Sequence, residues 1–191
     1  MSRSTRHKDG SDEEYDLVEA SNWILGAILV GILGAYMYKY MEGGGRSELV
    51  GQTAPSFDAQ QLGSEERVGI QDYRGEVVVI DFWTTWCPPC REQMKHLKTL
   101  KGDPDLGPTV KILSVNADEP SPNRIRKVRA FLKQRDADFT TLLDNGRVMQ
   151  AYGVDSFPTL FVVDADGRVT YAESGMHPVG LLGEQIQQAR R

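Results

Sequence analysis

Two cysteines, Cys87 and Cys90, are the residues of this chain best suited to carry chemistry. They are the only cysteines among 191 residues, and they follow a run of apolar, β-branched residues that begins at Val77. A buried strand that delivers a Cys-x-x-Cys pair to the start of a helix is typical of a dithiol/disulfide redox site. Because so short a loop restrains the unfolded chain little, the spacing argues against a purely structural disulfide.

Each residue of this motif has an expected role. Cys87 is the candidate nucleophile, because a helix amino terminus stabilises a thiolate. Cys90, one helical turn later, resolves the mixed disulfide that Cys87 forms with a substrate. Pro88 and Pro89 offer no N–H donor to the thiolate, so we expect a moderately reducing site. A zinc site would need further ligands, and the sequence holds only three histidines, His7, His96 and His177. We therefore expect no metal and no cofactor besides the Cys87–Cys90 disulfide.

Asp81 is a carboxylate inside the otherwise apolar run that precedes the cysteines. Burial of an unpaired charge is costly, so the pKa of this carboxyl group should be raised. Two interpretations stay open from the residue alone. Asp81 serves the redox site as an acid or base, or it is merely tolerated at the end of a strand.

The remaining elements can be predicted from periodicity and from turn residues. The net charge of −5 provides no basic surface for nucleic acid. Apolar runs predict strands, and 3.6-residue periodicity predicts helices. The expected strands are 57–62, 67–70, 76–83, 110–115, 140–143, 160–163 and 169–171, and the expected helices are 91–101, 121–135, 147–152 and 179–189. This order predicts an α/β sandwich with a mixed central sheet.

The chain divides into four expected segments. Residues 1–19 read as a disordered polar tail, 20–41 as a transmembrane anchor, 42–48 as a flexible linker and 49–191 as the soluble domain. No charged residue occurs between Ala20 and Tyr38. A helix of that length spans roughly 28 Å, close to the hydrocarbon thickness of a bilayer. A buried core helix and a cleaved signal peptide are the alternatives, and the few flanking Lys and Arg residues specify orientation weakly.

Two motifs together resemble the thioredoxin superfamily, and most closely its membrane-anchored TlpA/ResA-type branch in bacteria. These are DFWTTWCPPC, and YGVDSFPTLFVVDADG about seventy residues later. The resemblance covers residues 49–191. It implies a thioredoxin-like fold and a thiol:disulfide oxidoreductase on the extracytoplasmic side of the bacterial inner membrane. It also implies disulfide-containing protein substrates, such as apocytochrome c or copper-site proteins, and a membrane electron donor that restores the dithiol.

The resemblance also implies roles for individual residues. Asp81 would accept the proton of Cys90. Pro158, after Phe157, would be a cis-proline whose backbone edge pairs with an extended substrate. The implied substrate contacts are Trp86, Pro88, Pro89, Phe157 and Pro158, whereas Trp83 would serve packing.

Some positions depart from this pattern or favour another function. Gln93 stands where the family often has a glutamate that relays protons, and we expect His177 to be a loop residue near the surface. The opening GQTAPSF and Thr84-x-x-Cys87 suggest a peroxiredoxin-type peroxidase, but Ile80 stands where that signature requires a proline. The third possibility is a non-enzymatic binding module that uses its disulfide as a switch.

Overall fold

The computed structural model describes residues 23, 25–35 and 47–191, and it separates residues 1–44 from residues 45–191. In the first unit, residues 25–35 are helical, and their large apolar side chains are exposed. Across the described positions, no helix combines the length and the apolar character that a membrane crossing requires. The predicted tail 1–19, and most of the predicted anchor 20–41 and linker 42–48, lie outside the described residues.

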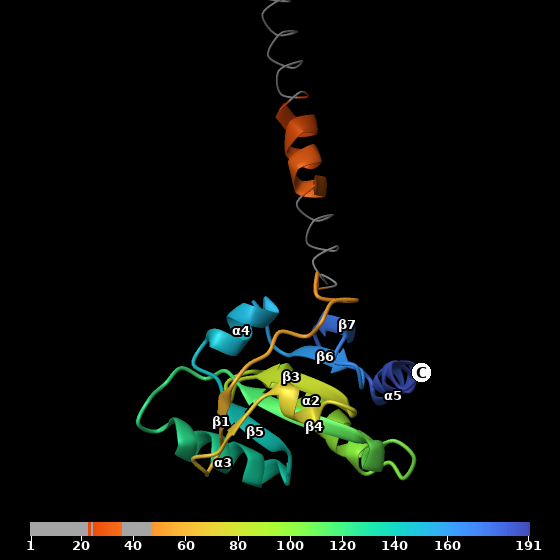
Figure 1. Ribbon diagram of the computed structural model, residues 1–191. Helices are drawn as coiled ribbons and strands as arrows, with labels where there is room; N and C mark the ends of the chain where they lie inside the picture. The colour runs from red at the N-terminus through yellow and green to blue at the C-terminus, as the bar shows by residue number, and fades with distance from the viewer. Residues whose placement is uncertain (1–22, 24, 36–46) are drawn as a thin grey trace, which may run out of the picture. The chain divides into compact units, whose positions relative to one another are not determined.

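A mixed sheet of seven strands forms the centre of the second unit (Figure 1). The strands lie in the order β2-β1-β5-β4-β3-β6-β7. They are β1 (Ala59–Gln61), β2 (Arg67–Val68), β3 (Val77–Trp83), β4 (Val110–Asn116), β5 (Thr140–Leu143), β6 (Thr159–Val163) and β7 (Val169–Ser174). The helices are α2 (Pro88–Lys101), α3 (Arg124–Arg135), α4 (Arg147–Tyr152) and α5 (Val179–Ala189), and short 3-10 helices span Ile70–Tyr73 and Gly107–Thr109. The predicted α/β sandwich with a mixed central sheet is confirmed.

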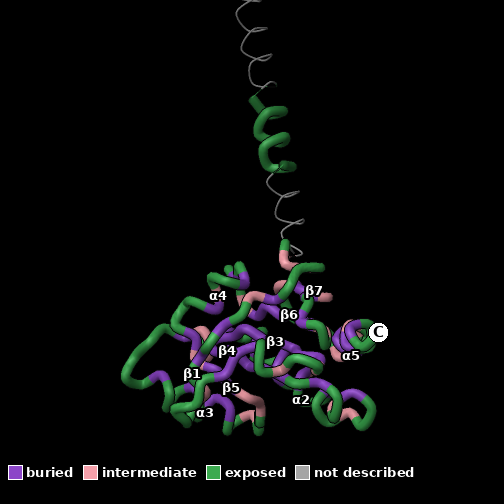
Figure 2. Tube along the Cα trace, in the orientation of Figure 1, coloured by how far each residue is buried: buried purple, intermediate pink, exposed green. Residues whose placement is uncertain are grey.

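Strand β3 is buried on both faces because helices cover both sides of the sheet (Figure 2). It pairs in parallel with β4 and antiparallel with β6. Ile80 and Phe82 pack in one apolar cluster with Tyr152 of α4. Val79 belongs to a second cluster, with Leu97 of α2 and residues of α5. The alternation of these side chains therefore places α2 and α5 on one face of the sheet and α4 on the other.

Helix α2 begins directly at the redox motif. Cys87 occupies the N-cap position, and the two prolines stand at the first two helical positions. Proline is favoured there because its fixed φ suits the first turn and its missing N–H would have no helical partner. The buried side of the helix runs from Cys90 to Leu100. Packing of α2 on the sheet thus fixes both cysteines at the carboxyl end of β3.

Several predicted elements differ in their bounds from the structure. The predicted strands 57–62 and 67–70 shrink to β1 and β2, and a 3-10 helix takes up Ile70–Tyr73. These strands pair with each other over only two residue pairs at the sheet edge, so little ladder is available to extend them. The helix predicted from Ser121 begins at Arg124, and its N-cap, Asn123, makes no side-chain cap. A turn closed by Arg124 N–H on the Ser121 carbonyl precedes it, so the predicted start of this helix at Ser121 is wrong.

Candidate active site

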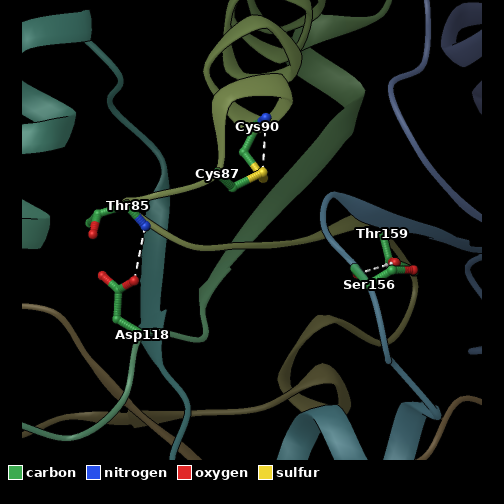
Figure 3. The surroundings of a disulfide bond; sticks show 6 residues. All are labelled: Thr85, Cys87, Cys90, Asp118, Ser156 and Thr159. Carbon is green, nitrogen blue, oxygen red and sulfur yellow. Dashed lines mark hydrogen bonds between the residues drawn. A yellow bond between two sulfur atoms is a disulfide. The ribbon is translucent and has the colours of Figure 1, made fainter.

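Cys87 and Cys90 form a disulfide at the amino terminus of α2 (Figure 3). Both residues are buried, Cys87 at 3% exposure and Cys90 at 0%. The N–H of Cys90 donates to Cys87 Sγ over 3.2 Å. Because Pro88 and Pro89 have no N–H, Cys90 provides the first amide donor of this helix. The arrangement holds the sulfur of Cys87 at the positive end of the helix dipole, where a thiolate is stabilised.

Asp81 lies on β3 before the redox motif and is completely enclosed. Its exposure is 0%, and neither carboxyl oxygen has a hydrogen-bond partner among the described residues. Its neighbours across the sheet are Ser114 on β4 and Leu160 on β6. Burial alone raises the pKa of Asp81 to about 7. A carboxyl group with that pKa can both accept and release a proton near neutral pH.

The two tryptophans of the motif lie in different environments. Trp83 is buried, stacks on Phe131 with ring centroids 4.8 Å apart, and donates its indole N–H to the Ser114 hydroxyl over 2.7 Å. Trp86 is 67% exposed and meets Phe157 edge to face at 6.0 Å. The structure therefore gives Trp83 the packing position expected for it. It leaves Trp86 accessible beside the disulfide, where a partner could touch it.

The Phe157–Pro158 segment approaches the disulfide from a distant part of the sequence. Its peptide bond is cis, as predicted. Phe157 packs against the apolar cluster that contains both cysteines. The segment leads into β6 and is fixed by local bonds: Thr159 Oγ1 donates to the Ser156 carbonyl over 2.7 Å (Figure 3), and Gly175 N–H donates to the Pro158 carbonyl over 2.8 Å. All eight predicted site residues lie at or beside the carboxyl end of β3, on the two segments 81–90 and 157–158.

A polar network beside the disulfide was not anticipated from the sequence. The carboxylate of Asp118 accepts the N–H of Thr85 over 2.9 Å (Figure 3) and an amide N–H of Asn116 over 3.3 Å. Arg124 donates to the side-chain oxygen of Asn116 over 3.1 Å, and burial lowers the pKa of Arg124. The available signal was the pair of polar residues Asn116 and Asp118 at the end of a buried strand.

These residues also line a groove next to Trp86. The groove has a volume of about 740 Å³. Trp86, Phe157 and Met149 contribute apolar surface, and Asp118, Glu119, Arg124 and Lys127 contribute charge of both signs. The structure thus provides an amphipathic groove that begins at Thr85 and Trp86, next to the redox motif.

His177 is buried rather than near the surface, so that prediction is wrong. Its exposure is 3%, and its backbone N–H donates to Gln93 Oε1 over 2.6 Å. Gln93 itself is 0% exposed on the inner side of α2. Burial lowers the pKa of His177. In the part of the chain that the structure describes, no group of three or more His, Cys, Asp or Glu residues is placed to hold a metal ion.

Comparisons with known proteins agree with this arrangement. The Redoxin family pattern matches residues 49–186. The thiol-disulfide oxidoreductase ResA of Bacillus thuringiensis is 31% identical over 168 residues, which cover 84% of this chain and 90% of ResA. The thioredoxin-like protein YneN of Bacillus subtilis is 30% identical and covers 76% of this chain and 85% of YneN.

Solved structures show the same similarity. The crystal structure of a protein assigned as the thiol:disulfide interchange protein DsbE from Chlorobium tepidum superposes with a TM-score of 0.63 at 28% identity, covering 76% of this chain and 97% of that one. StoA from Bacillus subtilis superposes with a TM-score of 0.57 at 26% identity, covering 69% of this chain and 96% of StoA.

Proposed function

The chain belongs to the Redoxin family and is a thiol:disulfide oxidoreductase, and from that premise we propose that it reduces disulfides of other proteins outside the cytoplasm while tethered to a membrane. One observation carries the proposal: the Cys87–Cys90 disulfide caps the amino terminus of α2 beside an accessible aromatic pair, Trp86 and Phe157. At this position Cys87 keeps a small exposed fraction, 3%, whereas Cys90 is fully buried, so a protein partner would attack or be attacked at Cys87.

The reaction proceeds through two thiol–disulfide exchanges. In the reduced enzyme, the Cys87 thiolate attacks one sulfur of a substrate disulfide, and the other substrate sulfur leaves as a thiolate. Cys90 then loses its proton and attacks Cys87 Sγ, which releases the second substrate thiolate. The enzyme ends with the Cys87–Cys90 disulfide, and two electrons have passed to the substrate. An electron donor in the membrane restores the dithiol.

Asp81 supplies the base for the second exchange. Cys90 is fully buried, so bulk water does not reach its thiol directly. Asp81 lies buried on the same side of the sheet as the inner face of α2, and its carboxyl group has a pKa of about 7. Near neutral pH, its ionised form can accept the Cys90 proton, and its protonated form can return the proton in the reverse reaction.

The substrate segment is an extended polypeptide that crosses the disulfide. The backbone of Phe157 and Pro158 offers an edge for such a segment, and the exposed Trp86 side chain offers an apolar contact. Cysteines of apocytochrome c and of copper-site proteins are the substrates that this family suggests. The disulfides of these polypeptides must be reduced to thiols before the cysteines bind haem or metal.

The membrane anchor is part of the same proposal. It rests on the uncharged stretch from Ala20 to Tyr38. We expect the full chain to stay with the membrane fraction in high salt and at alkaline pH. A variant lacking residues 1–48 should appear in the soluble fraction. Release of the full chain by salt alone would contradict the anchor.

The test of the function is a trapping experiment with Cys90→Ser. This variant keeps the Cys87 nucleophile but cannot resolve, so substrates should stay attached as mixed disulfides that dithiothreitol releases. Cys87→Ser, which lacks the attacking sulfur, is the matched control and should trap nothing. Wild-type chain should also catalyse the reduction of insulin disulfides. Efficient peroxide consumption without insulin reduction would favour a peroxidase, and absence of both activities would favour a binding module.

A further inference from the structure

Two side chains of α2 hold the backbone of one loop residue. Gln93 Oε1 accepts the N–H of His177 over 2.6 Å, and His96 Nδ1 lies 2.8 Å from the His177 carbonyl oxygen. Gln93 and His96 are one turn apart on the helix that begins at the disulfide, and Gln93 follows Cys90 by one turn. Both polar groups of this peptide backbone are therefore satisfied by the redox helix.

The same loop is joined to the other side of the active site. His177 belongs to residues 175–178, between β7 and α5. The N–H of Gly175 donates to the Pro158 carbonyl over 2.8 Å, and the hydroxyl of Ser174 lies 2.9 Å from that of Thr159. Gly175 has a φ of 104°, a conformation that glycine adopts without steric cost. One loop thus connects α2 to the segment that faces the substrate.

The loop is fixed by packing as well as by hydrogen bonds. The His177 ring is buried, meets Tyr171 edge to face at 5.7 Å, and places Nε2 3.8 Å from a carboxylate oxygen of Glu173. Tyr171 and Glu173 on β7 contact this ring, whereas Gln93 and His96 on α2 contact the His177 backbone. The loop cannot shift without exposing or unpairing these groups.

Burial of the Gln93 side chain costs free energy of folding, and fold stability alone does not explain why this residue is buried. Since the backbone N–H of His177 can only donate, the atom that accepts it is the amide oxygen, which fixes the orientation of the amide. The amide nitrogen is then buried, and it has no hydrogen-bond partner among the described residues. A buried polar atom left unpaired in this way points to a role beyond packing.

We propose that Gln93 is a positioning residue for polypeptide substrates. It holds the 175–178 loop, and through Gly175 the Phe157–Pro158 edge, at a fixed spacing from the disulfide. This inference rests on the proposed function. An extended polypeptide must contact that edge and Cys87 at the same time, whereas a small disulfide needs Cys87 alone. A carboxamide suits the task because it accepts the His177 N–H at every pH and is not itself ionisable.

The experiment compares two substrates for the full chain in detergent. The variants are Gln93→Leu, which removes the acceptor, Gln93→Glu, which keeps one, and Gln188→Leu, the same change at an exposed position of α5. The kcat and KM values are measured for reduction of insulin and of dithiodipyridine. For Gln93→Leu, we expect the ratio of the two kcat/KM values to fall about 10-fold, mainly through the KM for insulin. Gln93→Glu at pH 8 should recover most of the ratio, and Gln188→Leu should match the wild type.

A second readout does not depend on activity. The Gly175 amide should exchange its hydrogen with solvent about 10-fold faster in Gln93→Leu, because the loop opens more often. His96→Ala keeps Gln93 and should cause smaller changes in the same direction, which covers the case of a Gln93→Leu chain that fails to fold. An unchanged ratio with unchanged exchange would overturn the positioning role. Equal losses for both substrates would overturn it as well, because they indicate damage at the disulfide. A wild-type chain that reduces dithiodipyridine but not insulin would instead overturn the proposed function, and this inference with it.

Discussion

At the scale of single residues, the chemistry depends on atoms that the fold leaves without partners. Both carboxyl oxygens of Asp81 and the amide nitrogen of Gln93 are buried and make no hydrogen bond within the described residues. Each such atom would cost stability in a purely structural setting. Here they lie on the strand just before the disulfide and on the helix just after it. Thr84 Oγ1 and His177 Nδ1 are buried and unpaired as well. Within the described residues, such side-chain atoms thus lie next to the redox motif and in the 175–178 loop that contacts its helix.

Asp81→Asn should slow resolution of the mixed disulfide. The amide cannot accept the Cys90 proton, so we expect a rate lower by about 10²-fold or more at neutral pH. The wild-type rate should rise with pH through the pKa of Asp81, about 7, and this rise should vanish in the variant. The measurement is single-turnover release of a labelled thiol bound to Cys87. A wild-type rate that is constant from pH 6 to 9 would contradict the role.

At the scale of elements, the position of the nucleophile depends on the contact between two loops. The loop after β3 carries Thr85, and the loop after β4 carries Asp118, whose carboxylate accepts the Thr85 N–H. A backbone bond from Ala117 N–H to the Trp83 carbonyl, 2.8 Å long, strengthens the same contact. The strand that precedes Cys87 is therefore held by the neighbouring strand and not only by its own helix.

Asp118→Leu should loosen the loop that carries Trp86. Loss of the acceptor leaves the Thr85 N–H unpaired, at a cost of about 1–3 kcal/mol in the free energy of unfolding. Urea unfolding measures this loss, and faster hydrogen exchange at Thr85 should accompany it. Asp118→Asn keeps an oxygen acceptor and is the matched control. Equal stability of the leucine and asparagine variants would show that the contact with Thr85 contributes little.

The sequence predicts correctly the elements that are long and whose sequence signals lie within a few residues of one another. The run Val77–Trp83 and the helix after it were predicted because burial on both faces and helical periodicity are visible within a few residues. The short edge strands were misjudged, because their lengths depend on how few partners they have. His177 was misplaced since its burial depends on Gln93, which is 84 positions away. Likewise, no local sequence pattern indicates that the Asp118 side chain accepts the N–H of Thr85, 33 positions earlier.

At the scale of the whole molecule, the buried acid links function to stability. The folded state raises the pKa of Asp81 from 3.8 to about 7, so between these values it binds a proton that the unfolded chain has lost. Stability therefore falls as pH rises through this window. His177 acts in the opposite sense, because burial lowers its pKa and acidification then favours the unfolded chain. Asp81 and His177 thus make the stability of the fold depend on pH in opposite directions.

Asp81→Asn should remove the fall in stability that accompanies a rise in pH from about 4 to about 7. The pKa difference corresponds to as much as about 4 kcal/mol of stability lost between pH 4 and pH 8 in the wild type. The asparagine variant should lack this loss and should be the more stable protein at pH 8, although it is the poorer enzyme. Urea unfolding of the oxidised proteins at four pH values between 5 and 8 measures the difference. Parallel stability curves would show that Asp81 is ionised in the fold at little cost.

The placement of Trp83 has an optical consequence. Its indole ring lies in the same buried cluster as Cys87 and Cys90. A disulfide in contact with an excited indole accepts an electron from it and quenches its emission, whereas two thiols quench far less. We therefore expect the fluorescence of Trp83 to increase when the enzyme is reduced, so that the chain would report its own oxidation state without any added dye.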